Sequence, residues 1–166
     1  MLLLIKKLDS KFAPFLFVLS HSDVTSTAKI LASASTTLDC DVSWHKVHRS
    51  REVKQSWVST VFTTAWACVQ SFDLVCRTQP ATIVANGPGT CVPLCYSAWL
   101  LGWLVAPFTS YLPKIVFVES FCRVQRLSLT GRLLYPIADR FLVQWPQLAA
   151  KHKRAVYLGD AKKLLH

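Results

Sequence analysis

Two stretches of the sequence combine residue types that can hold an anion. The first separates the apolar run 81–85 from a longer, charge-free apolar run, and it reads Asn86-Gly87-Pro88-Gly89-Thr90. Glycine lets the backbone approach a ligand closely, and Thr90 with the first free N–H groups of a following helix would favour a phosphate. A tight exit from a strand explains the same pentapeptide. The five residues alone leave both interpretations open.

The second stretch is "VESFCRVQRLSLTGR", in which a carboxylate precedes three arginines. Glu119 stands where a predicted strand ends, and Arg123, Arg126 and Arg132 follow it at the same predicted edge. A carboxylate among arginines can position sugar hydroxyls or act as a base, while the arginines suit a diphosphate. A surface ion pair accounts for these residue types equally well.

Other chemistries find little support in the sequence. It contains no G-x-G-x-x-G and no Walker lysine motif, so dinucleotide and nucleoside-triphosphate sites are disfavoured. The histidines His21, His45 and His48 have no carboxylate or nucleophile at an informative spacing. The six cysteines form no C-x-x-C pair and have no histidine at metal spacing, so no metal site is predicted. We expect buried, reduced thiols in a domain that faces the cytosol.

Strand and helix patterns alternate along the chain. The predicted strands are 13–20, 42–48, 81–86, 114–120, 140–144 and 155–159, and the predicted helices are 25–34, 53–70, 91–106, 129–137 and 145–152. Continuous apolar strands that alternate with helices predict an α/β fold, a Rossmann-like parallel sheet with helices on both faces. Ligands bind such sheets beyond the C-terminal strand ends, where the 86–90 loop and Glu119 fall. The length of 166 residues predicts a single domain over residues 1–166.

Composition points to an acidic partner and to an apolar contact. Apolar residues make up 52% of the chain, charged residues 17%, and the formal net charge is +10. Residues 114–166 carry ten Lys/Arg against three Asp/Glu, whereas residues 1–55 carry eight against five. Nucleic acid is disfavoured as the partner because most aromatic residues fall within apolar strands and helices. Anionic membrane and phosphorylated ligands remain.

One apolar segment raises the question of a membrane span, and the N-terminus raises the question of a signal peptide. Residues 78–113 carry no charge, but glycines and prolines interrupt them, which favours a buried helix. The N-terminal "MLLLIKKLD" has too short an apolar block for a signal peptide and predicts a first amphipathic helix.

Several separated motifs together resemble one known family. They are "NGPGTCVPLCYSA", "VFVESFCRVQRLSLTGRLLYPIADRFLVQWPQL" and "VYLG", with "VHRSREVKQSWVSTVFTTAWACVQSF" as the middle segment. In this order and spacing they resemble the membrane-anchoring subunit of the eukaryotic two-subunit N-acetylglucosaminyltransferase. That enzyme adds the second N-acetylglucosamine (GlcNAc) to dolichyl-diphosphate-GlcNAc in the N-glycosylation pathway. The resemblance covers roughly residues 15–159.

The resemblance implies a fold, partners and a location. The family is similar to the N-terminal, acceptor-binding half of GT-B glycosyltransferases, so it implies one Rossmann-like half-domain. It implies a heterodimer with a catalytic subunit that binds UDP-GlcNAc, a dolichyl-diphosphate-GlcNAc acceptor, and the cytosolic face of the endoplasmic reticulum membrane. The chain would be a glycosyltransferase subunit that is not active alone, with no cofactor, no metal ion and no nucleic acid.

The resemblance also transfers candidate residues by position. Asn86, Gly87, Gly89 and Thr90 would belong to the acceptor-side loop, with Arg123 a further candidate for binding the acceptor diphosphate. Glu119 would match the Glu after the strand in the bacterial "HEQN"-type motif, as a contact to the acceptor sugar or as a structural carboxylate. No residue of the chain is assigned as the catalytic base.

The family pattern differs from this sequence at the N-terminus. It begins with a transmembrane helix, a strand and a Gly-rich "GSGGHT"-type loop, and "MLLLIKKLDSKFAPF" resembles the helix just after that loop. The resemblance therefore implies an N-terminally truncated form. The alternative role for such a form is a scaffold that binds a partner without supporting transfer.

Overall fold

The computed structural model describes residues 14–20, 42–47, 57–86 and 89–159. The chain divides into two compact units, residues 1–49 and residues 50–166, and each is described by itself. The predicted helices at the N-terminus and at 25–34 lie outside the described residues. A single domain over residues 1–166 stays a prediction.

The first unit contains a pair of parallel strands, at the positions expected from the sequence. Strand β1 (Phe15–Ser20) pairs with β2 (Val42–Val47) so that Phe15 lies opposite Val42 and Ser20 opposite Val47. The apolar run of β1 and the alternating residues of β2 thus both form strands.

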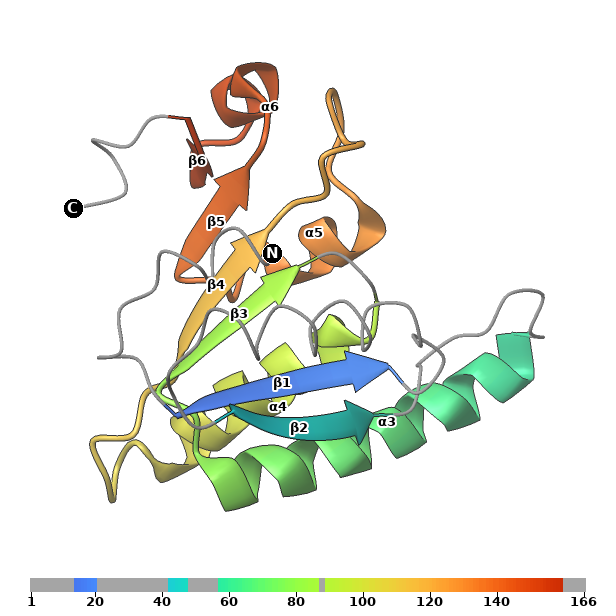
Figure 1. Cartoon of the computed structure of the whole chain (residues 1–166), viewed down its shortest axis with the longest axis vertical. Coiled ribbons are helices and arrows are strands. Elements are labelled where there is room, and N and C mark those ends of the chain that lie inside the picture. Colours follow the sequence, from blue (N-terminus) through green and yellow to red (C-terminus); the bar gives the residue numbers. More distant parts are fainter. Residues whose placement is uncertain (1–13, 21–41, 48–56, 87–88, 160–166) are drawn as a thin grey trace. The chain divides into compact units, whose positions relative to one another are not determined.

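The second unit is a four-stranded parallel sheet with helices between its strands. Its strands β3 (Thr82–Asn86), β4 (Lys114–Val118), β5 (Arg140–Val143) and β6 (Ala155–Tyr157) lie side by side in sequence order. The helices are α3 (Trp57–Thr78) before β3, then α4 (Cys91–Val105), α5 (Leu129–Leu134) and α6 (Pro146–Lys151) in the three connections (Figure 1). Parallel strands joined by helices confirm the predicted α/β, Rossmann-like fold.

Two helices differ from their predicted lengths. Helix α3 continues to Thr78, beyond the predicted end at residue 70, because its apolar stripe continues through the buried residues Leu74 and Val75. It stops where Gln79 adopts a left-handed φ of 40° and donates its N–H to the Val75 carbonyl, one residue before Pro80. Helix α5 ends earlier than predicted, at Leu134. In its last turn the Tyr135 N–H donates a hydrogen bond to the Gly131 carbonyl.

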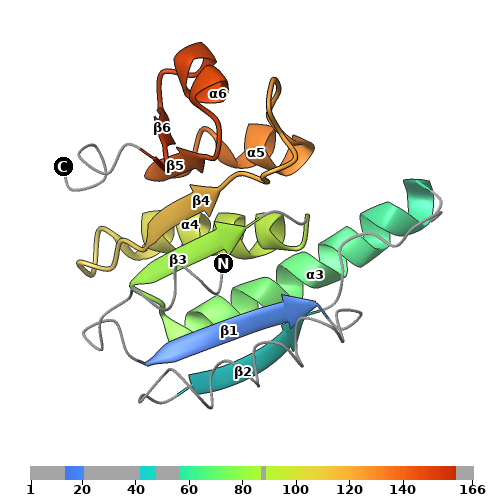
Figure 2. The same cartoon turned by 45° about the horizontal axis from the view of Figure 1, so that its top comes forward.

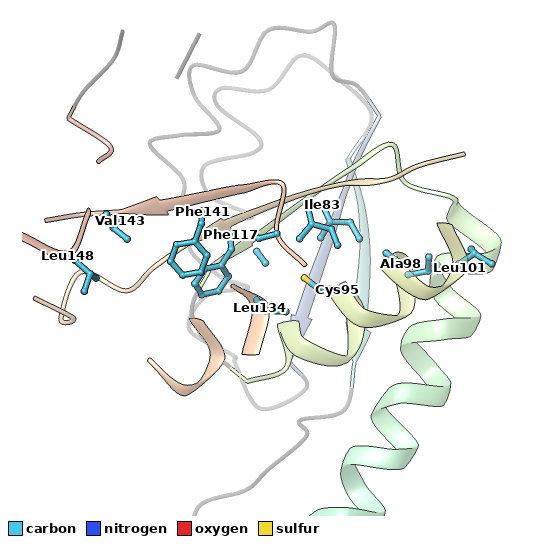
Figure 3. Packing of buried hydrophobic residues seen from close by; sticks show 13 residues of the cluster. Ile83, Cys95, Ala98, Leu101, Phe117, Leu134, Phe141, Val143 and Leu148 are labelled. Atoms are coloured by element: carbon cyan, nitrogen blue, oxygen red, sulfur yellow. The ribbon is translucent and has the colours of Figure 1, made fainter. Parts of the chain in front are cut away.

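The core is built from both aromatic and aliphatic side chains on β4 and β5. The rings of Phe117 and Phe141 lie 5.1 Å apart, and Leu134 from α5 and Cys95 from α4 pack nearby (Figure 3). Successive residues of a strand point to opposite faces, yet Phe141, Leu142 and Val143 are all buried. Both faces of the sheet are therefore covered at β5, as the continuous apolar run predicts.

Helix α4 is buried on one side only. Figure 2 shows it behind β3 and β4, with α3 beside it. Its residues Cys95, Ala98 and Leu101 are buried and belong to the core (Figure 3). The opposite side carries Trp99 and Trp103, which is 67% exposed. The expectation of a buried helix is thus wrong for this outer side.

One of the glycines that interrupt the apolar segment 78–113, Gly102, has a structural reason. A Cβ atom there would lie 2.8 Å from Cδ of Pro113, so the close approach of α4 to the start of β4 requires glycine. Within the described ranges, no helix combines the length and the hydropathy that a membrane crossing needs.

The core predicts a strong difference between two phenylalanines. Phe141→Ala removes a ring that is 1% exposed and should lower the free energy of unfolding by about 3–5 kcal/mol. Phe108→Ala is the control, because Phe108 is 88% exposed, and its effect should stay within about 0.5 kcal/mol. Urea unfolding followed by tryptophan fluorescence measures both. Similar losses for the two variants would contradict this placement of the core.

Candidate functional site

The two candidate stretches leave the sheet at the same edge. Strands β3 and β4 are parallel, and Asn86 at the end of β3 lies opposite Val118 at the end of β4. The 86–90 loop follows Asn86 and Glu119 follows Val118, and the strand arrowheads in Figure 1 point the same way. The topology thus brings together the residues that the sequence singled out, at the edge where parallel sheets bind ligands.

Part of the 86–90 loop is described. Gly87 and Pro88 lie outside the described residues, while Gly89 is exposed and its carbonyl accepts the Val92 N–H at 3.2 Å. Thr90 has helical backbone angles, φ −63° and ψ −22°, and its hydroxyl does not cap the helix. The first turn of α4 offers few N–H groups to another acceptor, because the Val92 N–H already donates to Gly89 and Pro93 has none. This arrangement is compatible with an anion but does not by itself define a site.

Glu119 is the most deeply buried charged residue among those described. It is 1% exposed, and its carboxylate accepts three hydrogen bonds from the chain that follows it. Oε1 accepts the Ser120 N–H at 2.8 Å, and Oε2 accepts the Ser128 N–H at 2.9 Å and the Ser128 hydroxyl at 3.1 Å. We call residues 120–127 the 120–127 loop. The donors to Glu119 are thus its first residue, Ser120, and the residue directly after it, Ser128.

The same contacts complete the N-terminus of α5. Ser128 is the N-cap, with φ −63° and ψ 164°, and its hydroxyl oxygen accepts the Gly131 N–H at 2.9 Å. In a capping box, a Glu at N3 would accept the N–H of the N-cap. Here N3 is Gly131, and Glu119 performs that function from the end of β4. A Cβ atom at Gly131 would overlap Glu119 Oε2 and lie 3.1 Å from Ser128 Oγ, so the position needs glycine.

A second contact holds the 120–127 loop from the side of β5. The Trp145 indole N–H donates to the Phe121 carbonyl at 2.7 Å, and the rings of the two residues lie 5.0 Å apart. The Lys151 ammonium donates to the Gln125 carbonyl at 3.5 Å. The loop is thus tied to β4, to the chain after β5 and to α6, although it has no regular secondary structure.

The arginines of the second stretch stay in solvent. Arg123, Arg126 and Arg132 are exposed, and none pairs with Glu119. Among the described residues, the ion pairs join Arg77 to Asp73 and Lys114 to Asp139. The surface ion pair that the sequence allowed for Glu119 is therefore wrong, because the carboxylate is buried and its acceptor sites are taken by N–H and O–H donors.

Not all of the basic C-terminal third is free for a ligand. The Arg154 guanidinium donates to the carbonyls of Tyr135, Pro136 and Ala138 at 2.7–2.9 Å, and it lies 5.7 Å from the Tyr135 ring. These bonds satisfy carbonyls at the end of α5. Arg154 is therefore a structural residue although it is exposed, and the charge count alone did not distinguish it from Arg123, Arg126 and Arg132.

Sequence reasoning missed several residues that build this edge. Ser128 could have been found as an N-cap, because a serine directly before an apolar helix is a start signal. Nothing in the local sequence marks the contact of Gly131 with Glu119 or the bond from Trp145 to Phe121, which spans 24 positions. The same holds at the opposite edge of the sheet for Arg154, whose bond to the Ala138 carbonyl spans 16 positions.

The cysteines differ among themselves in exposure. Cys95 is fully buried, and burial raises its pKa to about 12, with the neighbouring Cys91 thiol adding to the effect. Burial also raises the pKa of Cys91, against a lowering by a backbone hydrogen bond at Asn86. Cys68 and Cys122 are exposed, so the expectation of buried thiols is wrong for these two. They lie on the solvent side of α3 and in the 120–127 loop.

Comparison with known proteins gives consistent matches over nearly the whole chain. The family described as "Oligosaccharide biosynthesis protein Alg14 like" matches residues 1–161. The rat protein named "UDP-N-acetylglucosamine transferase subunit ALG14" is 46% identical over 163 residues, which cover 94% of this chain and 74% of the rat protein. The human protein of that name is 43% identical over the same shares, and the Schizosaccharomyces pombe protein is 44% identical over 96% of this chain and 75% of its own length.

The N-cap of α5 predicts a measurable loss of stability. Ser128→Ala removes the hydroxyl that caps the helix and donates to Glu119, and should lower the free energy of unfolding by about 2 kcal/mol. Ser120→Ala is the matched control, since Ser120 bonds Glu119 through its backbone N–H, which alanine retains. Chemical denaturation of both variants tests this. Equal losses would show that the Ser128 hydroxyl does not bind as described.

The thiol environments predict an order of alkylation. Iodoacetamide at pH 8 should modify Cys68 and Cys122 in the folded protein and leave Cys95 unmodified until the protein unfolds. The raised pKa of Cys95 favours the neutral thiol, so its contribution to stability is full below the unfolded pKa of about 8.5 and is lost as the pH rises towards 12. Peptide mass spectrometry identifies the labelled cysteines. Rapid labelling of Cys95 in the folded state would contradict its burial.

Proposed function

The chain belongs to the Alg14 family of oligosaccharide biosynthesis proteins, and we propose that it acts as a subunit of a UDP-N-acetylglucosamine transferase. In this proposal it presents a lipid-linked GlcNAc diphosphate, dolichyl-diphosphate-GlcNAc, to a separate catalytic subunit that binds UDP-GlcNAc. The complex works at the cytosolic face of the endoplasmic reticulum membrane, to which this subunit recruits its partner. The chain alone does not transfer sugar.

The observation that carries the proposal is the shared edge of β3 and β4. Two loops with residues suited to an anion leave neighbouring parallel strands there, and an acceptor diphosphate needs such donors. The glycines of the 86–90 loop allow close backbone approach, and the exposed Arg123 can form paired hydrogen bonds to phosphate oxygens. Asn86, Gly87, Gly89, Thr90 and Arg123 are the residues proposed to hold the diphosphate.

The chemistry of transfer divides between the two subunits. The 4-hydroxyl of the acceptor GlcNAc forms a bond to C1 of the donor sugar, the bond from C1 to the UDP oxygen breaks, and a base accepts the hydroxyl proton. This subunit contributes by orienting the acceptor, which lowers the entropic part of the barrier. Glu119 is a poor choice for the base because both of its oxygens already accept hydrogen bonds.

Co-expression with the catalytic subunit tests the proposed assembly. The expected result is a complex that survives purification and that converts a dolichyl-diphosphate-GlcNAc analogue to the chitobiose product, while neither chain does so alone. Restored synthesis in cells depleted of their own subunit would extend this result. A complex that forms but transfers no sugar would leave a scaffold role and overturn the proposal for this chain.

Substitution of the glycines tests the 86–90 loop. Gly89→Val and Gly87→Val should lower kcat/KM for the acceptor by roughly 10-fold or more, since a β-branched side chain blocks close backbone approach. The unfolding midpoint should change little in comparison. If stability and transfer fall together by the same free energy, the loop is only a structural turn.

A further inference from the structure

The 120–127 loop displays its charged and apolar side chains in a fixed arrangement. Phe121, Val124 and the arginines Arg123 and Arg126 are exposed, with Phe121 at 65% and Val124 at 39%. Residues 120–159 contain seven Lys/Arg and a single acidic residue, Asp139. Asp139 lies at the other edge of the sheet, where it accepts the N–H of Ile115 near the start of β4. The loop therefore carries positive charge with no exposed carboxylate among its own residues.

The shape of this loop depends on the carboxylate of Glu119, which is buried beneath it. A buried carboxylate costs several kcal/mol of desolvation unless donors surround it, and the donors of Glu119 are the two ends of the loop. An open loop would leave the buried carboxylate without these partners. The closed loop is thus favoured before any ligand arrives, and less ordering entropy opposes binding.

We propose that Glu119 is a positioning residue for the acceptor. Its carboxylate closes the 120–127 loop so that Arg123 and Arg126 meet the diphosphate of the lipid-linked sugar, and it does not itself touch the acceptor. The apolar side chains Phe121 and Val124, on the same loop, then lie next to the first isoprenoid units. This inference rests on the proposed function, because it assumes that the ligand is an isoprenoid diphosphate.

Replacement of Glu119 by glutamine separates holding the loop from contacting the sugar. Each oxygen of Glu119 accepts at least one backbone N–H, so whichever position the amide NH₂ of Glu119→Gln takes, it faces another donor. The variant keeps the size of the side chain but loses the hydrogen bond that holds one end of the loop. Asp139→Asn is the matched control, since it makes the same chemical change at the opposite edge of the same sheet.

Limited proteolysis tests the holding role without any activity. Trypsin cleaves after arginine, and the loop contains Arg123 and Arg126. In E119Q, cleavage at these two sites should be about tenfold faster than in the wild type, the factor that corresponds to about 1.4 kcal/mol of lost loop stability. D139N should be cleaved there at the wild-type rate. Unchanged cleavage in E119Q would overturn the holding role.

Steady-state kinetics of the complex with the catalytic subunit tests the link to the acceptor. E119Q should raise KM for a dolichyl-diphosphate-GlcNAc analogue about tenfold and leave KM for UDP-GlcNAc and kcat within twofold. Arg126→Ala, with an intact Glu119, should raise the acceptor KM in the same direction. S128A retains the Ser128 N–H bond and should show smaller shifts in both assays, which keeps the test valid if E119Q folds poorly.

The outcomes distinguish this inference from the proposed function. Faster cleavage of E119Q with an unchanged acceptor KM would show that the loop does not meet the acceptor, and transfer by the wild-type complex would leave the proposed function intact. A fall in kcat alone would place Glu119 at the reacting atoms and overturn its positioning role. Failure of the wild-type complex to transfer sugar would overturn the proposed function and the acceptor contact, while proteolysis would still decide whether Glu119 holds the loop.

Discussion

The buried carboxylate of Glu119 is the constraint on which the C-terminal edge of this sheet depends. A carboxylate that is buried away from water needs hydrogen-bond donors around it. The backbone N–H groups of Ser120, the next residue, and of Ser128, nine positions further along the chain, supply them. One side chain thereby closes the loop and supplies an acceptor for the N–H of Ser128, the N-cap of α5. The Glu119 N–H also donates to the Leu142 carbonyl on β5, so the same residue continues the sheet.

The residue types at several neighbouring positions follow from that carboxylate. Gly131 lacks a side chain because the carboxylate occupies the space that a Cβ atom would need. Ser128 supplies a hydroxyl that can both donate to Glu119 and accept from Gly131, which few other side chains can do. The exposed arginines of the loop are then left free of the nearest carboxylate, and their charge remains available to a ligand.

The sheet and its helices could be predicted from the sequence because they depend on local patterns. The apolar runs that form β3, β4 and β5 are continuous, and Pro or Gly interrupts the chain between them. The lengths of α3 and α5 were predicted less well. The end of α3 depends on the left-handed conformation of Gln79 before Pro80, and α5 stops within a segment that remains apolar. Burial of α4 was also predicted only in part, because an all-apolar helix gives no sign of which side faces the sheet.

For the candidate site, the sequence by itself determined which residues stand at strand ends and therefore which loops share an edge. Strand order and parallel direction follow from short-range connections, so the sequence alone places Asn86 and Glu119 at the same edge of the sheet. Only the tertiary structure decided what Glu119 does, because its donors Ser120 and Ser128 converge through the fold and a chain position carries no record of burial. Only the structure likewise distinguishes Arg154, which is exposed but binds three carbonyls, from Arg123 and Arg126, which pair with no carboxylate among the described residues.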